Sequence, residues 1–457
     1  MEREIQNWIY SKKDEMLEVL GELIAIPSVM GEPSDGAPFG AEPKRALLKM
    51  QEICDKYGFS TRNIKNAVLC ADYSTIGGEA ELGILAHLDV VPVEPQNWST
   101  NPFVLTEKDG VLFGRGTIDD KGPAVAALFA LRCVKELGIP LKKGVRLIFG
   151  TNEENGSEDL EIYKKHDKFP PKVFTPDGSF PIINIEKGMM RSQFVGKISD
   201  DRLLEFHGGK IPNAVPDKAE AVLRGVSPEE VQKAIYTQCS FAEFRTEQQS
   251  DAVKIICTGR SAHASTPECG INAVTALISL ISRILDEPVL AGLTRIFPFG
   301  ETDGKSINLQ SHDQSGALTC VFSIFSIENG QASGTVDVRF PTCLNLALVE
   351  QKEREAFASA GLQFDGYMGD EPHVVSESDD FVKALLNVYE RVEGEKGYCV
   401  AIGGGTYVHD IEGGVAFGAE RGDTDYHMHG DDEFITVDEL LKDAVLFANA
   451  ILEICAE

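Results

Sequence analysis

The chain has 457 residues, of which 43% are hydrophobic and 25% charged, a composition typical of a folded protein of two or three domains. Its 72 acidic and 43 basic residues give a net charge of -29, which disfavours nucleic acid and anionic membranes as partners. The ten cysteines are scattered without a CxxC pair, so we expect no thiolate zinc site, no disulfide scaffold and a reducing, cytoplasmic location.

The first part of the chain has helical patterns followed by strands. Residues 1–20 alternate charged and apolar side chains, which predicts an amphipathic helix rather than a secretory signal, and no run approaches the ~20 apolar residues of a membrane span. Helical spacing recurs at 14–27 and 43–57. From Ala67, short apolar runs alternate with helical segments, which predicts an α/β sheet. Residues 120–137 are apolar on nearly every side and predict a buried helix packed on that sheet.

The character of the sequence changes after about Glu186. A second set of strands and amphipathic helices follows, and a final stretch near residue 375 returns to a helix and a buried strand-like run, GVAFG. We therefore expect an α/β domain with a mixed, mostly parallel sheet flanked by helices, interrupted by an inserted α+β domain. The expected boundaries are 1–186, 187–374 and 375–457.

The segment GILAHLDVVP is an apolar run that stops at a histidine and an aspartate. Because side chains alternate along a strand, His87 and Asp89 project to the same side. An imidazole beside a carboxylate at the end of a buried strand suits a metal ligand whose second ring nitrogen is held by an acid. The alternative is a histidine that only closes a strand, and the motif alone favours this alternative.

Two further blocks place carboxylates at the ends of predicted elements. In GRGTIDDKGP, Asp119 and Asp120 precede the buried helix, and either one alone is explained by a helix cap. In TNEENGSED, Glu153 and Glu154 follow a predicted strand. In a metal hydrolase, one of two such carboxylates binds the metal while the other takes a proton from water. The alternative for this pair is a solvated acidic loop.

The last two blocks add a carboxylate and two histidines. Asp177 lies in a proline-rich loop, where PDG is also a common turn. In DTDYHMHGDDE, residues 423–433, His427 and His429 alternate along an extended segment. Imidazole and carboxylate groups are ligands that zinc, manganese and cobalt accept. Together, two histidines and three carboxylates suit a pair of divalent cations that share one carboxylate.

The order of these blocks, HLD, GRGTIDDKGP, NEE, PDGSFPIINIEKG and HGDDE, resembles that of the M20 metallopeptidases over essentially the whole chain. Within them it is most similar to the bacterial dipeptidase V and Xaa-His dipeptidase group. The resemblance implies that Asp119 bridges two metals and that the peptide bond after it is cis. His87 and Asp177 would complete one metal site, and Glu154 and His429 the other. The family's HxxDE pattern selects His429, since chemistry alone does not distinguish the two histidines of this block.

The same resemblance assigns residues to catalysis and substrate binding. Asp89 would orient His87, and Glu153 would be the general base that activates a metal-bridging water. His263, in GRSAHAS, would stabilise the oxyanion from an inserted lid domain, although without the resemblance it would be interpreted as a surface histidine. The residues expected to hold the substrate are Asn213, Arg339, Gly404 and Thr406. The last two lie in GGGTY, which a plain glycine turn explains about as well.

These expectations define a function. The chain is expected to be a dipeptidase with two divalent metal ions, with zinc favoured and manganese or cobalt as alternatives, acting on small peptides as a monomer or weak homodimer. Two other functions stay open at this point. One is an M20 deacylase or desuccinylase that acts on N-acyl amino acids, and the other is an inactive family member used for binding.

Overall fold

The computed structural model describes residues 1–457 except 76, 238–240, 423 and 457. The described residues form two compact units. Unit 1 comprises Met1–Asn184, Val374–Val400 and Gly405–Glu457, and unit 2 comprises Ile185–His373 and Ala401–Gly404. Ala401–Gly404 belongs to unit 2, although the expected boundaries place all of 375–457 in the first domain. The expected boundaries stay a prediction.

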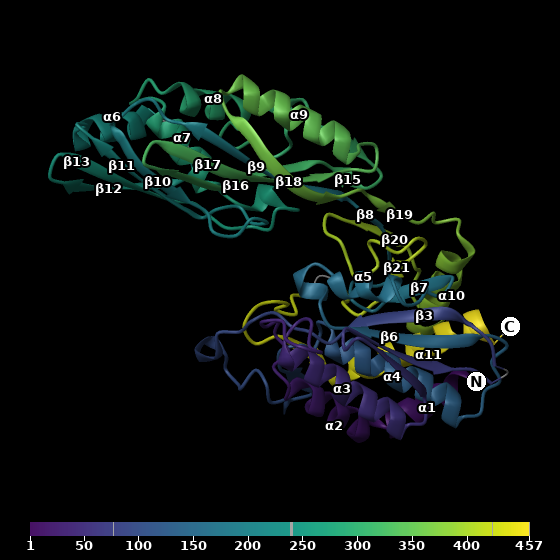
Figure 1. The fold of residues 1–457 in the computed structure, drawn as a ribbon. Helices are drawn as coiled ribbons and strands as arrows, with labels where there is room; N and C mark the ends of the chain where they lie inside the picture. The colour runs from purple at the N-terminus through teal and green to yellow at the C-terminus, as the bar shows by residue number, and fades with distance from the viewer. Residues whose placement is uncertain (76, 238–240, 423, 457) are drawn as a thin grey trace. The chain divides into compact units, whose positions relative to one another are not determined.

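Unit 1 is built on a mixed sheet of nine strands (Figure 1). In spatial order these are β1 (Ser60–Ile64), β2 (Val68–Tyr73), β6 (Gly144–Gly150), β3 (Ala80–His87), β7 (Lys172–Thr175), β21 (Val415–Ala416), β8 (Ile182–Glu186) and β19 (His373–Val374), with β20 (Cys399–Ile402) also beside β8. The central strands β6, β3, β7 and β21 pair in parallel, whereas β1, β2 and β8 join their neighbours in antiparallel fashion. The expected mixed sheet is confirmed, and the expectation that it is mostly parallel holds for the central strands β6, β3, β7 and β21.

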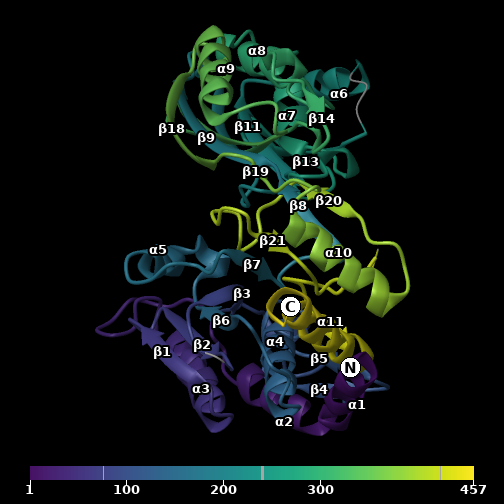
Figure 2. The ribbon, with the colours of Figure 1, turned by 90° about the vertical axis from the view of Figure 1, so that its right-hand side faces the viewer.

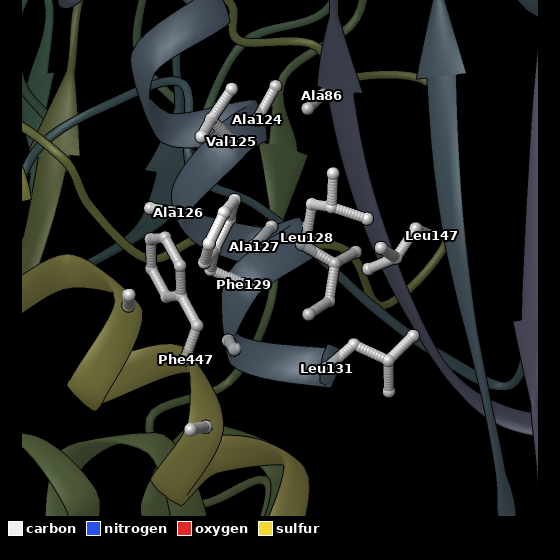
Figure 3. Close-up of a cluster of buried hydrophobic side chains, with 14 of the residues drawn as sticks. Ala86, Ala124, Val125, Ala126, Ala127, Leu128, Phe129, Leu131, Leu147 and Phe447 are labelled. Atoms are coloured by element: carbon white, nitrogen blue, oxygen red, sulfur yellow. The ribbon is translucent and has the colours of Figure 1, made fainter. Parts of the chain in front are cut away.

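The helices of unit 1 pack on this sheet, whose strands are apolar on both faces, or on the helices that cover it. They are α1 (Glu2–Ser11), α2 (Lys13–Ile24), α3 (Ala41–Lys56), α4 (Lys121–Glu136), α5 (Glu158–Lys164), α10 (Asp380–Glu393) and α11 (Val437–Cys455). On one face, Ala86 and Leu147 pack against α4, which in turn packs against Phe447 of α11 (Figures 2 and 3). On the opposite face, Leu85 and Ile148 belong to a separate cluster that includes α5 residues.

A small sheet joins two distant loops of unit 1. Its strands are β22 (Phe434–Thr436), β5 (Val111–Phe113) and β4 (Thr106–Lys108). The antiparallel register of β22 on β5 pairs Phe434 with Phe113. The segment that ends at Glu433 is therefore held beside the segment that starts at Gly114, which brings two of the predicted motifs together.

Unit 2 contains an eight-stranded antiparallel sheet with its helices on one face (Figure 1). The strand order is β12 (Glu243–Gln249), β13 (Ala252–Thr258), β11 (Lys218–Arg224), β10 (Leu203–Gly208), β16 (Thr319–Glu328), β17 (Gln331–Phe340), β9 (Gly188–Lys197) and β18 (Gln363–Asp370). The other elements are α6 (Pro228–Thr237), α7 (Ala273–Ile281), α8 (Pro288–Ile296), α9 (Leu346–Ser359) and the short pair β14 (His312–Asp313) and β15 (Gly316–Ala317). Burial alternates along β11, as expected for a strand with only one covered face.

The helices differ in detail from the sequence patterns. The expected amino-terminal helix over 1–20 is broken at Lys12 into α1 and α2. The expected buried helix over 120–137 is present as α4, whose residues Lys121 to Val134 are all buried. None of the helices in the described part of the chain combines the length and apolar character that a membrane span needs.

Candidate metal centre and active site

The first candidate ligands lie at or just after the carboxyl ends of the central parallel strands. His87 is the last residue of β3, and its register partner on β6 is Gly150, three residues before Glu153. Asp177 follows β7, the strand on the other side of β3. Because the carboxyl ends of parallel strands meet at one edge, three separate motifs converge there.

Two groups of possible metal ligands share Asp119. We call His87, Asp119 and Asp177 the His87 group, and Asp119, Glu154 and His429 the His429 group. The donor atoms of each group lie within 4.8 Å of one another. Asp119 reaches both histidines, with Oδ1 2.9 Å from His87 Nε2 and Oδ2 2.8 Å from His429 Nε2. Asp177 Oδ2 lies 3.7 Å from His87 Nε2, and Glu154 Oε2 lies 3.1 Å from His429 Nε2.

The two histidines sit in a strongly negative environment. Burial by itself lowers the pKa of His87, but the hydrogen bond to Asp119 and the nearby carboxylates outweigh it and raise the pKa well above its ordinary value. Hydrogen bonds to Asp119 and Glu154 raise the pKa of His429 to about 11. Both imidazoles thus attract a positive charge, either a proton or a cation.

Three carboxyl groups of the centre have raised pKa values, which also indicates an excess of negative charge. Burial and the charge of Asp177 raise the pKa of Glu153 well above its ordinary value. Burial and the charge of Asp119 raise the pKa of Asp177 to about 7 and also raise the pKa of Glu154. Crowded carboxylates and imidazole nitrogens of this kind are what divalent metal ions neutralise, so the donor set fits such ions.

Asp89 connects the end of β3 to the turn that carries Glu153 and Glu154. Its carboxylate oxygens accept the backbone N–H groups of Glu153 and Glu154, each at 3.2 Å. His87 Nδ1 lies 3.1 Å from the Asp89 carbonyl oxygen and 3.5 Å from its carboxylate. The Asp89 carbonyl is the nearer partner of His87 Nδ1, and its carboxylate holds the backbone of the neighbouring turn, so the orienting role expected of the carboxylate stays a prediction.

The loop that carries Asp119 is held by a buried glutamate. Glu433 Oε1 accepts backbone N–H groups of Gly116, Ile118 and Asp119 at 3.0 to 3.2 Å. The other carboxylate oxygen of Glu433 accepts a hydrogen bond from Arg115 at 2.5 Å. Arg115 also donates to the Gly430 carbonyl at 3.0 Å. The Asp119–Asp120 peptide bond is cis, as the resemblance implied. Glu433 and Arg115 thus tie the Asp119 loop to the His429 loop.

A second buried pair holds the turn after β6. The Tyr407 hydroxyl donates to Asp159 Oδ2 at 2.6 Å, and the same oxygen accepts the backbone N–H groups of Thr151 and Asn152. The Tyr407 ring also meets the His87 ring edge to face, with ring centroids 5.9 Å apart. The Tyr407 hydroxyl also leaves no room for a side chain at position 150, because a Cβ on Gly150 would lie 1.5 Å from it.

The histidine block separates into two roles. Both side chains are exposed, but His429 belongs to the His429 group, whereas the His427 ring lies against the Asp431 carbonyl and Phe434. The structure thus distinguishes two histidines that chemistry alone left equivalent. Asp423, at the start of this block, lies outside the described residues.

The substrate-binding candidates of unit 2 form two local sets. Asn213 and His263 are neighbours, since the Asn213 carbonyl accepts the Ala264 N–H and Ala214 bridges to His263. His263 is exposed, and its Nδ1 lies 2.7 Å from the Ser265 hydroxyl.

The second set of unit 2 surrounds Arg339. This side chain is buried, and its Nε and Nη2 donate to Asp337 at 2.6 and 3.2 Å. Its Nη1 faces the Gly403 carbonyl at 3.4 Å, next to the candidate Gly404. Thr406 lies in unit 1, where its carbonyl accepts the His409 N–H.

Several residues around the centre were not predicted from the sequence. Glu433 and Tyr407 stand inside the HGDDE and GGGTY blocks, so these motifs contain a signal for them. Arg115 and Asp159 likewise stand inside the GRGTIDDKGP and TNEENGSED blocks, whereas Glu420 lies outside every quoted block and has no signal of its own. Their contacts span up to 318 positions of the chain, which sequence spacing does not reveal.

Comparison with known proteins agrees with this geometry. A model of peptidase family M20/M25/M40 matches residues 83–453. YtjP of Bacillus subtilis (strain 168) is 33% identical over 468 residues, covering 98% of this chain and 99% of that protein. The Beta-Ala-Xaa dipeptidase of Lactobacillus delbrueckii subsp. lactis is 33% identical over 463 residues, covering 97% of each. The structure of human carnosine dipeptidase 1 shares the fold, with a TM-score of 0.64 and 17% identity over 99% of this chain and 98% of that one. The chain therefore belongs to peptidase family M20/M25/M40.

Proposed function

We propose that the protein is a metal-dependent dipeptidase that hydrolyses the peptide bond of small peptides with a free amino terminus. The observation that carries this proposal is the pair of donor groups that share Asp119 in a chain of this peptidase family. The Lactobacillus relative, by its name a Beta-Ala-Xaa dipeptidase, supports dipeptides as the substrate class.

The two donor groups are proposed to hold one divalent ion each. Asp119 offers one oxygen to each group, which suits a bridging ligand. When bound, such ions polarise the scissile carbonyl and lower the pKa of a water molecule. Zinc is favoured for a set of imidazoles and carboxylates, and manganese and cobalt are the alternatives to test.

Glu153 is the proposed general base. Burial and neighbouring carboxylates raise its pKa, so it holds a proton more readily than a solvated glutamate does, as a group that takes and returns a proton requires. Its carboxylate takes a proton from the attacking water while the water oxygen bonds to the carbonyl carbon. The same group then gives the proton to the leaving nitrogen as the C–N bond breaks. Asp89 holds the Glu153 backbone in place for both steps.

Unit 2 is proposed to act as a lid that supplies further substrate contacts. His263 would stabilise the oxyanion, and Asn213 would hold the substrate backbone. Arg339 would bind the terminal carboxylate, which is supported by the way Asp337 fixes its guanidinium plane. Gly404 and Thr406 would offer backbone N–H groups to the same end of the substrate.

The cellular setting is also a proposal. The described cysteines are all free, which supports a reducing, cytoplasmic location. A monomer or weak homodimer is the proposed state.

A substrate panel tests the function. Protein stripped of metal and restored with zinc or manganese is assayed on dipeptides, tripeptides and N-acyl amino acids. We expect turnover of dipeptides after metal is restored. Turnover confined to N-acyl amino acids would assign the protein to the deacylases instead, and turnover of no compound by fully loaded protein would favour a binding protein.

A further inference from the structure

Glu420 lies beside the loop that carries Asp177. Its backbone N–H donates to the Gly178 carbonyl at 2.9 Å, and its own carbonyl accepts the Phe180 N–H at 2.9 Å. These two bonds form a parallel bridge to Ser179. The position of Glu420 next to the metal centre is therefore set by backbone pairing.

The residue that follows, Arg421, turns away from the centre. Its guanidinium pairs with the buried Asp443 of α11 at 2.7 Å and with Glu393 of α10 at 3.3 Å. It also covers the Phe180 ring, 4.8 Å from the centroid. These contacts commit the Arg421 guanidinium to α10 and α11.

The charge of Glu420 acts on the proposed metal ligands. Burial raises the pKa of Glu420 to about 7, and the charge of Asp119 adds to the effect. In turn, the charge of Glu420 contributes to the raised pKa of Asp177. Among the described residues, no hydrogen bond or ion pair to the Glu420 carboxylate is found, so it is a half-buried acid that lacks a cationic partner.

The charges of the centre leave Glu420 in excess. Two divalent ions would carry four positive charges, whereas Asp119, Glu153, Glu154 and Asp177, together with the adjoining Asp89 and Asp120, supply more than four carboxylates. Glu420 adds another carboxylate at the edge of this set. Such a charge is unfavourable there unless a further cation approaches.

We infer that Glu420 binds the protonated amino group of the substrate's amino-terminal residue. This inference rests on the proposed function, because it explains how the site would select a free amine and disfavour an N-acyl group. An ammonium against a half-buried carboxylate makes a charge-assisted hydrogen bond, which is stronger than a neutral one.

The test compares two substrates that differ only in this amino group, alanyl-alanine and propionyl-alanine. In Glu420→Gln, we expect KM for alanyl-alanine to rise about 10- to 100-fold, the effect of losing a hydrogen bond between charged groups. We expect kcat to change less and the rate on propionyl-alanine to stay within about twofold. Glu420→Asp, which keeps the charge, should recover part of the discrimination. Glu412→Gln, at an exposed acid of the preceding loop, is the matched control.

Metal analysis and thermal unfolding distinguish amine binding by Glu420 from metal ligation and from a general folding defect. An equal loss on both substrates would overturn the inference, as would loss of bound metal in a folded Glu420→Gln protein, which would make Glu420 a ligand. If Glu420→Gln does not fold, unchanged discrimination between the two substrates in Glu420→Asp, with KM for both raised equally, would also overturn it. A wild-type enzyme that hydrolyses propionyl-alanine but not alanyl-alanine would instead refute the dipeptidase function itself.

Discussion

The two halves of the metal centre are built in different ways. In the His87 group, the histidine ends a central strand and its side chain is 0% exposed. In the His429 group, the histidine lies on a loop with a backbone φ of 61° and its side chain is 53% exposed. Both groups use the same buried aspartate, Asp119, so the contrast comes from what holds each histidine.

This contrast indicates how each half is kept in place. The backbone pairing of β3 with β6 positions His87, whose N–H also donates to the buried Asp120 carboxylate at 3.0 Å. His429 depends on side-chain ties, mainly the buried Arg115–Glu433 pair and its bond to Gly430. We therefore expect an ion in the His429 group to exchange more readily than one in the His87 group.

The largest effect is expected where both halves stay intact but the base is removed. Glu153→Ala should lower kcat by about 10²- to 10⁴-fold, the usual contribution of a positioned base, while two metals per chain are retained. Steady-state kinetics and elemental analysis measure the two quantities. Glu161→Ala, an exposed glutamate of α5, is the control. A Glu153→Ala protein with an unchanged rate would refute the proposed mechanism.

The second substitution should weaken the His429 group alone. Arg115→Met leaves Glu433 buried without its ion-pair partner, and removing one member of such a pair costs about 3 to 5 kcal/mol of stability. We expect a chelator to remove the His429-group ion at lower concentration than in the wild type, with less change for the other ion. Chelator titration with metal analysis measures this difference, and Arg202→Met, at an exposed ion pair, is the control. Equal weakening of both ions would contradict the contrast between the halves.

Asp89 touches both halves, so its substitution should affect them together. Asp89→Asn keeps the size of the side chain but turns one of its two acceptors for the Glu153 and Glu154 N–H groups into a donor. We expect metal affinity or turnover to fall by about 10- to 100-fold, as is usual for groups that orient ligands. Metal titration and kinetics are the measurements, and an unchanged enzyme would show that the backbone alone holds this turn.

The smallest effect concerns the pH dependence of the metal-free protein. The pKa of Asp177 rises from 3.8 to about 7 on folding, so its contribution favours the folded state at low pH and is lost as pH rises from about 4 to 7. The raised pKa of His429 acts in the same direction, because its contribution is complete below about 6.5 and declines toward its folded value of about 11. Metal-free protein should therefore unfold at a higher temperature at pH 5 than at pH 8.

Adding metal should reverse this order. Divalent ions bind the deprotonated ligands, so protons compete with them at pH 5 and hardly at pH 8. Zinc or manganese should raise the unfolding temperature more at pH 8, and calorimetry with and without metal measures this. A metal-induced increase that is equal at both pH values would contradict the assignment of these side chains as ligands.

The sequence was sufficient for the local part of this architecture. The alternation of apolar runs and helices predicted the α/β sheet, and the all-round apolar character of 120–137 predicted the buried helix α4. The strand-end position of His87 followed from its place after an apolar run. These features depend on residues close together in the chain, so period and composition contain the information. The break at Lys12 was missed because both flanking segments have the same helical pattern.

For the centre itself, the motifs by themselves determined which residue types are available and in what order. The HxxDE pattern selected His429 over His427 by resemblance, and the structure places His429 beside Asp119 and Glu154. Only the tertiary structure brought Arg115 to Glu433, Tyr407 to Asp159 and Glu420 to the Asp177 loop. The physical reason is that each of these contacts depends on strand pairing or loop packing between segments far apart in the chain. The role inferred for Glu420 depends on the charged groups that the fold places around it, which its position in the sequence does not reveal.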